Sequence, residues 1–587
     1  MTLSQIVRKV GRHLFPADPG PDPFPEDAWT DPAYGDWFRL HRATESELDA
    51  QRHTFFRDGV LFSIVVPLFH TPLGFLTDMV DSVIGQTYSH FELVLVNASP
   101  EDKELAAKVS EYCQRDARVR CIPLAKNRGI AENTNEGIAA ARGEFVCFLD
   151  HDDTLEPNAL YEYAKAIGEN HEIDMLYCDE DLIEEDSKGQ LRHMHPFFKP
   201  AYSPEALLCT NYILHFLTIR KGLLDEISRA GSLFDGTQDY RNILSVIRKT
   251  DRVHHVSKVL YHWRICESST AANPDAKPYD RIAARRSIGW YIASEYPDAR
   301  VIGSGIVNTQ NLWFRPSKDK SVVSVIVDGR GVFADLPGFL ELFQQTNSYN
   351  HVEVIVVSEE SIEGDSAKSH VNIHTVPASF SRFACFNAGA REAKGVYLVF
   401  MDAGSSFQSA EPLEQMLGLC KREGVGVVAP KTLYADGSVR CYGVAVTPER
   451  IMPLYRGFPD DFPGYQCNTR GFQNNSAASY LGLMTPRSLF EEVGGFDERF
   501  EGEIGTADYC RRVLNAGKRI VQTCTVKVQS DERAPKLHYD NKTNAPDFAS
   551  ADLARFDEKW PDVRALGDPY FNCNFDQSSS YFQIAQS

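Results

Sequence analysis

Gly143-Glu-Phe-Val-Cys-Phe-Leu-Asp150-His-Asp152-Asp153 is the stretch that decides the fold of this 587-residue chain. Its apolar run, Phe145 to Leu149, predicts a buried strand of a parallel sheet. Three carboxylates follow that strand, at the edge where open α/β sheets bind their ligands. Like charges gathered there need a cation to neutralise them. A hard divalent ion that holds a diphosphate fits this need, although the motif alone also fits a solvated acidic turn.

A second copy of this pattern lies further along the chain. Asn135 stands fifteen residues before Asp150, and Asn387 stands fifteen residues before Asp402. In both copies a helix of small residues, a glycine and an apolar strand lie between the two positions. Order and spacing together predict duplication of a whole domain rather than of a short repeat. The second copy keeps one carboxylate, because Gly404 stands where the first copy has Asp152.

Composition limits the class of protein. The chain is 43% hydrophobic and 24% charged, which is ordinary for a globular protein with two to four domains. Its net charge of −20 argues against a general nucleic-acid binder, which would present a basic face. No apolar run predicts a membrane span or a signal peptide. Thirteen scattered cysteines without a Cys-x-x-Cys pair predict a reduced, cytoplasmic chain that has no zinc site.

The alternation of strands and helices divides the chain into five segments. We expect an N-terminal helical extension at 1–60, a first α/β domain at 61–270, a helical connector at 271–320, a second α/β domain at 321–545 and a tail at 546–587. The connector carries a predicted helix from Arg281 to Ser294, and each α/β domain opens with an apolar strand.

The N-terminal extension shows three patterns. Apolar residues at helical spacing within 1–15, with basic residues among them, predict a helix that lies either on an anionic membrane surface or on the protein's own body. A proline-rich stretch from Phe15 to Pro25 excludes helix and inner strand. A second helix is predicted from about Tyr34 to Phe56.

Four further polar features lie near predicted strand ends or helix starts. Asp239 falls in the first turn of a predicted helix, as a carboxylate favoured by the helix dipole or as a general base. His262 ends an apolar run, either as a structural residue or as a neutral metal ligand. The acids Asp179, Glu180 and Asp181 form a solvated turn or a polyol-binding site. The loop Lys126-Asn127-Arg128-Gly129 permits close approach to a ligand.

The order of these motifs across 61–264 resembles the family 2 glycosyltransferases. The residues that carry the resemblance are Ser63-Ile-Val-Val-Pro67, Ser82-Val-Ile-Gly-Gln-Thr-Tyr88, Asn127-Arg-Gly-Ile-Ala131, Phe148-Leu-Asp-His-Asp-Asp153, Cys178-Asp-Glu-Asp181, Pro196-Phe-Phe-Lys-Pro200, Gln238-Asp-Tyr240 and Leu260-Tyr-His-Trp-Arg264. The resemblance implies two tandem GT-A domains, each α/β and Rossmann-like with a mostly parallel sheet, behind a helical N-terminal extension.

The resemblance also implies roles for these residues. Asp150 would contact the ribose of a nucleotide-sugar, with Pro67, Asn97, Asn127 and Gly129 completing the donor site. Asp152 would hold Mn²⁺ or Mg²⁺, with His262 as a further ligand. Asp239 would take the proton of an acceptor hydroxyl, so that the product has inverted configuration. Asp179, Glu180 and Asp181 would face the acceptor.

One departure from the family concerns the nucleobase. The family usually has a carboxylate pair after its second strand, where this chain has Val96-Asn97-Ala98-Ser99. Asn97 can still donate and accept hydrogen bonds at a pyrimidine edge. Base preference is therefore left open between dTDP-rhamnose and a UDP-sugar.

The second domain resembles the same family more loosely, through Pro430-Lys-Thr-Leu-Tyr434, Asp436-Gly-Ser438, Gly443-Val444, Phe490-Glu-Glu-Val-Gly-Gly-Phe-Asp-Glu498 and Leu537-His-Tyr539. Where the family has its base, this domain has Gly505-Thr506-Ala507-Asp508. We expect a degenerate domain that binds acceptor polymer or partner proteins.

The resemblance implies an enzyme of bacterial surface-polysaccharide synthesis, at the cytoplasmic face of the membrane. It would move a sugar to a hydroxyl of a lipid-linked or polymeric glycan. Two alternatives stay open. One is a non-catalytic glycan-binding or scaffold protein. The other is a sugar nucleotidyltransferase, which would need a glycine-rich, arginine-containing loop that Val66-Pro-Leu-Phe-His70 does not provide.

Overall fold

The computed structural model describes residues 33–186, 189–265, 278–306, 309–314, 320–330, 336–358, 371–375, 380–535 and 550–585. These residues form two compact units. The first contains residues up to 202, residues 211–295 and those from 583. The second contains residues 203–210 and 296–582. The predicted helix within 1–15, the proline-rich stretch and the motif at 537–539 lie outside the described residues.

The first unit is built on one nine-stranded sheet. Its path runs β3 (Val119–Pro123), β2 (Phe91–Asn97), β1 (Phe62–Leu68), β4 (Phe145–Phe148), β8 (Thr218–Arg220), β6 (Met175–Glu185), β9 (Val253–Arg264) and β5 (Thr154–Leu155), and β7 (Leu191–Phe197) pairs with β6. Strands β3, β2, β1 and β4 are parallel to one another, as are β6 and β9. Strand β8 runs antiparallel between them.

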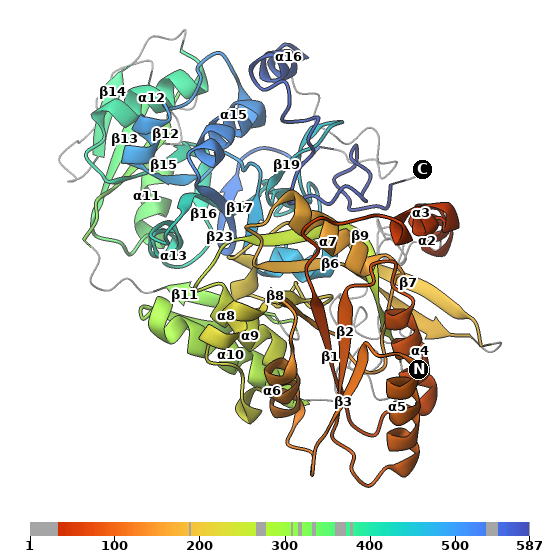
Figure 1. Ribbon diagram of the computed structural model, residues 1–587. Coiled ribbons are helices and arrows are strands. Elements are labelled where there is room, and N and C mark those ends of the chain that lie inside the picture. The colour runs from red at the N-terminus through yellow and green to blue at the C-terminus, as the bar shows by residue number, and fades with distance from the viewer. Residues whose placement is uncertain are drawn as a thin grey trace. The chain divides into compact units, whose positions relative to one another are not determined.

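The two faces of this sheet are covered by different helices (Figure 1). Ile64, Val66 and Leu68 point to one face, where the core also contains apolar residues of α4 (Leu73–Ile84) and α5 (Lys103–Arg115). Val65 points to the other face and contacts α6 (Ile130–Ala140) at Gly137. Side chains of a strand alternate between faces, so one apolar run supplies both cores.

The second unit repeats this strand order in a ten-stranded sheet, whose additional strand β21 (Gln473–Asn475) pairs with β23. Its path runs β14 (Val371–Thr375), β13 (Val352–Ser358), β12 (Val323–Asp328), β15 (Tyr397–Asp402), β22 (Met484–Pro486), β17 (Val425–Leu433), β23 (Arg519–Ser530) and β16 (Ser405–Phe407). Off this path, β18 (Val439–Cys441) pairs with β17, as β7 does with β6. The predicted duplication and the predicted pair of tandem α/β domains are confirmed.

The two copies also share local contacts. The Ser63 hydroxyl donates to Glu92 and accepts from the backbone N–H of Gly143. Ser324, Glu353 and Gly395 repeat this arrangement in the second unit. A Cβ on Gly143 or Gly395 would collide with the opening strand, which explains why a glycine precedes each strand-end acid.

The helical N-terminal extension is confirmed, with one correction. The predicted helix from Tyr34 to Phe56 is two helices, α2 (Tyr34–His41) and α3 (Glu45–Arg52). Thr44 caps α3, because its hydroxyl accepts from the Glu47 backbone N–H while the Glu47 carboxylate accepts from Thr44. This capping box starts a new helix at Glu45, so the single helix that was predicted is divided after His41.

The helix expected between the α/β domains is α10 (Pro278–Glu295), which packs on α9 (Gln238–Val246) within the first unit. No helix of the described ranges combines the length and apolar character needed to cross a membrane.

We predict that Gly137→Ala lowers the free energy of unfolding by about 1–3 kcal/mol, the usual cost of overpacking. A Cβ at this position would lie 2.3 Å from Cγ1 of Val65. Gly168, in helix α7 (Ala159–Glu169), is the matched control because a Cβ there meets nothing within 4 Å. Urea unfolding should show Gly168→Ala to be neutral or stabilising. Equal effects of the two substitutions would contradict the packing argument.

Candidate active site

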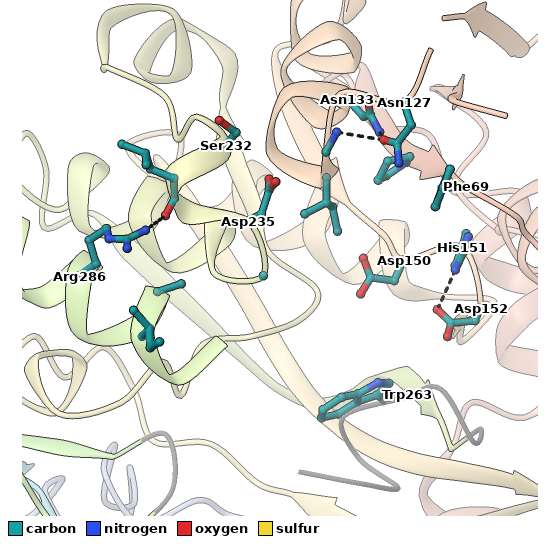
Figure 2. A pocket seen from close by; sticks show the side chains of 17 residues that line it. Phe69, Asn127, Asn133, Asp150, His151, Asp152, Ser232, Asp235, Trp263 and Arg286 are labelled. Carbon is teal, nitrogen blue, oxygen red and sulfur yellow. Dashed lines mark hydrogen bonds and ion pairs between the residues drawn. The ribbon is translucent and has the colours of Figure 1, made fainter. Parts of the chain in front are cut away.

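A cavity of about 890 Å³ opens at the carboxyl ends of the strands of the first unit (Figure 2). One wall comes from the end of β1, the loop into α6 and the residues after β4. The opposite wall comes from the loop before α9 and from α10. The lining includes Pro67, Phe69, Asn127, Gly129, Ile130, Asn133, Asp150, His151, Asp152, Ser232, Leu233, Asp235, Gly236, Trp263, Ile282, Ala283 and Arg286.

The start of α6 forms one corner of the cavity. Gly129 caps this helix with φ +92°, a conformation that favours glycine. The Asp235 carboxylate comes from the opposite wall and accepts the backbone N–H of Ala131 at 3.0 Å. A Cβ on Gly129 would lie 2.4 Å from Oδ2 of Asp235, so only glycine permits this approach.

The acids after β4 have different environments. Asp150 and Asp152 line the cavity, whereas Asp153 is fully buried. Asp153 accepts hydrogen bonds from the Tyr261 hydroxyl and, at 2.8 Å, from the Arg264 backbone. Burial, with the neighbouring charges of Asp152 and Asp150, raises the pKa of Asp153 well above its usual value. Asp153 therefore has a structural role, whereas the side chains of Asp150 and Asp152 line the cavity.

Asp239 is the second residue of α9. Its Oδ2 accepts a hydrogen bond from Nδ2 of Asn211 at 2.7 Å. Burial raises the pKa of Asp239, and the charge of Asp150 adds to the increase. A carboxylate with a raised pKa is a better proton acceptor than an exposed one, which suits a general base.

Asn211 belongs to a segment, 211–216, that a buried lysine holds in place. Nζ of Lys199 donates to Oε2 of Glu180 at 2.7 Å and to the carbonyls of Ile213 and His215 at 2.7 and 2.6 Å. His215 lies 3.2 Å from the same Glu180 oxygen and stacks on Tyr261 at 4.3 Å between ring centroids. Burial lowers the pKa of His215, but Glu180 outweighs burial and raises it to about 9.

A second buried network surrounds His262. Its Nδ1 lies 2.6 Å from Oδ1 of Asp181, and its Nε2 lies 3.1 Å from Glu156. Burial opposes the charged form, yet the two carboxylates raise the pKa of His262 to about 10. The N-terminal extension covers this network, because Tyr34 donates to Asp181 and Arg42 donates to Glu156.

The structure brings five of the predicted site residues together in the cavity wall: Pro67, Asn127, Gly129, Asp150 and Asp152. Asp239 is not among the lining residues, but it is close enough for the charge of Asp150 to raise its pKa. Asn97 is not among the lining residues; it is buried and accepts the backbone N–H of Ser99 at 3.0 Å.

The three acids predicted to face an acceptor lie inside β6 and are buried. Asp179 pairs with His255 at 2.7 Å, Glu180 with Lys199, and Asp181 with His193 and His262. Their side chains therefore hold the neighbouring segments in place. His262 belongs to this network and not to the cavity wall.

Two groups among the described residues have the composition of a metal site. One is Asp150, Asp153 and His215, and the other is Asp181, His193 and His262. In each group the neighbouring carboxylates raise the pKa of the histidine, so a bound metal would have to displace a proton from His215 or His262. The carboxylates of Asp150 and Asp152 are the donors in this region that suit a hard divalent ion.

Sequence reasoning missed several residues of the site. Lys199 lies in a motif already noted, but an isolated lysine gives no sign that it will be buried. Asn211, Asp235 and Arg286 have no motif of their own. Asp235 could have been suspected, because it precedes Asp239 by four residues in a glycine-containing loop.

Comparison with known proteins gives one family. Residues 63–228 match the model described as "Glycosyl transferase family 2". An uncharacterized protein of Sinorhizobium fredii, y4gI, is 28% identical over 88% of this chain and 58% of its own length. The O-antigen biosynthesis protein RfbC of Myxococcus xanthus is 29% identical over 87% of this chain and 40% of its own length. The chain thus spans about half the length of these relatives.

Among solved structures, residues 1–349 of S. aureus TarS in complex with UDP-GlcNAc align with a TM-score of 0.32 and 23% identity. The alignment covers 40% of this chain and 66% of that one. A TM-score this low shows nothing about the site. Its own geometry and the family match at residues 63–228 carry the assignment.

We predict that His262 makes folding stability depend on pH. Its pKa of about 10 in the folded protein exceeds the ordinary 6.5. The stabilisation is therefore complete below about pH 6.5 and is lost as the pH rises towards 10. Denaturant unfolding of the wild type and of His262→Gln should show a gap in stability at pH 7 that narrows towards pH 10. A gap that stays constant with pH would assign the titration to another group.

Proposed function

We propose that this chain, whose residues 63–228 are a family 2 glycosyl transferase domain, is an inverting, metal-dependent glycosyltransferase. One observation carries the proposal. The cavity gathers Asn127, Gly129, Asp150 and Asp152 within the first unit, and the charge of Asp150 acts on a half-buried acid, Asp239. These are the groups needed to hold a nucleotide-sugar and to accept a proton next to it.

The donor would lie along the strand-end wall. Asp152, with Asp150 beside it, would hold Mn²⁺ or Mg²⁺, because both side chains offer carboxylate oxygens to the cavity. The ion, when bound, neutralises the charge of the leaving diphosphate. Asp150 would also contact the ribose, and the loop at Asn127 and Gly129 would accommodate the donor. We assign His262 to the structural network around Asp181 and not to the metal.

Asp239 would accept the proton of the attacking hydroxyl. Its carboxylate is fixed by Asn211, and its raised pKa strengthens it as a base. The acceptor oxygen would attack the anomeric carbon from the side opposite to the leaving diphosphate. This attack in a single displacement inverts the configuration of the sugar.

The acceptor is proposed from the relatives. RfbC is named for O-antigen biosynthesis, which supports a lipid-linked or polymeric bacterial surface glycan as the acceptor. Both dTDP-rhamnose and a UDP-sugar agree with an asparagine, Asn97, in place of the acids that usually follow the second strand.

We predict that Asp152→Asn and Asp239→Asn each reduce turnover by at least 100-fold, the range typical for loss of a general base or of metal-held charge. The assay mixes the protein with UDP-, dTDP- and GDP-sugars and Mn²⁺ and measures released nucleoside diphosphate. Chelator should abolish the release. Asp225→Asn is the matched control, because Asp225 lies outside the cavity and pairs with Lys221 on the surface.

Two results would contradict this proposal. If turnover continues with chelator present and also in Asp152→Asn, the proposed metal dependence is wrong. Metal-dependent nucleotide binding without turnover of any donor, with acceptor glycan present, would favour the glycan-binding alternative.

We predict that Asn211→Ala shifts the acidic limb of the pH–activity profile upwards by about one to two pH units. The Asn211 amide stabilises the ionised form of Asp239, and a hydrogen bond to a charged group contributes about 1.5–3 kcal/mol. Losing it raises the pKa of Asp239 further, so activity at pH 7 falls and recovers in alkaline buffer. A loss that is uniform across pH would mean that Asn211 only supports the fold.

A further inference from the structure

The wall of the cavity that lies opposite to the strand ends comes from a part of the chain outside the family match. The strand-end wall belongs to residues 63–228, which match the family model. Leu233, Ile282 and Arg286 line the opposite wall beyond that match, and we call these three residues the distal wall. Figure 2 shows Arg286 on the side of the cavity opposite to Asp150. The chemistry of the distal wall is therefore a property of this chain that the family match does not describe.

The residues of the distal wall are held together by two elements. Ile282 and Arg286 are four residues apart in α10, so they lie on one face of that helix. Nη1 of Arg286 donates a hydrogen bond to the backbone carbonyl of Leu233, in the short helix η2 (Ser232–Phe234). One guanidinium and two aliphatic side chains therefore share one patch of the cavity wall.

The distal wall leaves large apolar side chains open to solvent. Leu233 is 68% exposed and Ile282 is 62% exposed, and Phe69, on the strand-end wall, is 42% exposed. Apolar residues that are scattered singly over a surface need no explanation, but several that line one cavity indicate a ligand with an apolar part. A nucleotide-sugar is polar over most of its surface and does not account for them.

Arg286 adds a positive charge to this apolar patch. It is the one lysine or arginine among the described residues that line the cavity, and its side chain is exposed. Within the described part of the chain its hydrogen bond goes to the Leu233 carbonyl, and no carboxylate pairs with it. Most of its five N–H donors are therefore available to a ligand. An arginine with available donors is well suited to bind phosphate.

The packing of the helices relates the distal wall to the acceptor. Helix α10 packs on α9, whose second residue is Asp239, the proposed base. The diphosphate of the donor is already assigned to Asp150 and Asp152, on the strand-end wall. A phosphate bound at Arg286 would therefore belong to the acceptor. The aliphatic side chains beside it fit an acceptor whose phosphate carries a hydrocarbon chain.

We propose that Leu233, Ile282 and Arg286 form a subsite for a lipid-linked acceptor. Arg286 binds the phosphate of this acceptor, and the two aliphatic side chains contact its hydrocarbon chain. The inference rests on the proposed function, and it narrows the acceptor from a lipid-linked or polymeric glycan to a lipid-linked one. A glycan without a lipid phosphate would use neither the guanidinium nor the apolar side chains.

Isothermal titration calorimetry of the full chain with geranyl phosphate tests the proposal. This probe joins one phosphate to a short isoprenoid chain, and EDTA in the buffer removes any metal-dependent binding. It should bind about tenfold more tightly than geraniol or inorganic phosphate, because only geranyl phosphate uses both parts of the subsite. Arg286→Gln and Ile282→Ser should each weaken its binding about tenfold.

Two variants are matched controls for this experiment. Arg285→Gln removes the neighbouring arginine of α10, which is exposed but is not among the lining residues. Leu40→Ser removes an aliphatic side chain of α2 that is 70% exposed and does not line the cavity. Both should bind geranyl phosphate as the wild type does, and circular dichroism identifies any variant that fails to fold.

Three results would overturn the proposal. They are no binding of geranyl phosphate, equally tight binding of geraniol, and binding that folded Arg286→Gln and Ile282→Ser both keep. Loss of Mn²⁺-dependent uridine diphosphate binding in Arg286→Gln, with geranyl phosphate binding unaffected, would also overturn it, because the arginine would then serve the donor.

The titration contains neither donor nor metal, so its outcome is separate from that of the transferase assay. A failed titration with donor turnover intact would contradict the lipid subsite alone. Binding of geranyl phosphate without turnover of any donor would contradict the proposed function and leave the lipid-phosphate site in place.

Discussion

The buried contact between Lys199 and Glu180 is the constraint on which the active site depends. A lysine that is fully removed from solvent costs several kcal/mol unless its three protons are bonded, and here each has an acceptor. Two of these acceptors are carbonyls of the segment 211–216, which carries Asn211 and His215. The ion pair therefore fixes a loop that contains no regular secondary structure, and through Asn211 it fixes Asp239. The position of Asp239 thus depends on a charge pair that lies outside the cavity wall.

The two units show how one topology keeps its packing contacts while its strand-end residues change. Sheet order, the glycine contacts on the opening strand and the serine–glutamate pair are repeated, because packing of the strands demands them. The positions that face the ligand have diverged. A carboxylate at Asp152 became Gly404, and an apolar Ile130 became Arg382.

The fold was more predictable than the site. Apolar strands and small-residue helices are local patterns, so the duplication and the first strands of both units followed from the sequence. Asp150 and Asp152 lie in the cavity wall because strand ends gather at one sheet edge, and their roles there stay a prediction. Burial of Asp179, Glu180 and Asp181 was not predictable, since it depends on partners such as Lys199 and His255 that lie far away in sequence. The break before Thr44 has a local cause, the capping box of Thr44 and Glu47, which the prediction of one helix from Tyr34 to Phe56 did not include. The long-range pairs that decide a side chain's environment leave no local pattern.

The contact between Asp235 and the start of α6 bears on the proposed binding of a nucleotide-sugar. The first turn of a helix normally attracts phosphate, because its free N–H groups carry partial positive charge. In this protein a carboxylate already occupies that place, and it comes from the loop that leads to Asp239. Under the proposed function, a diphosphate would be repelled from this corner and would meet the acidic edge at Asp150 and Asp152, where a cation would have to receive it. The nucleotide would then be admitted only together with its metal.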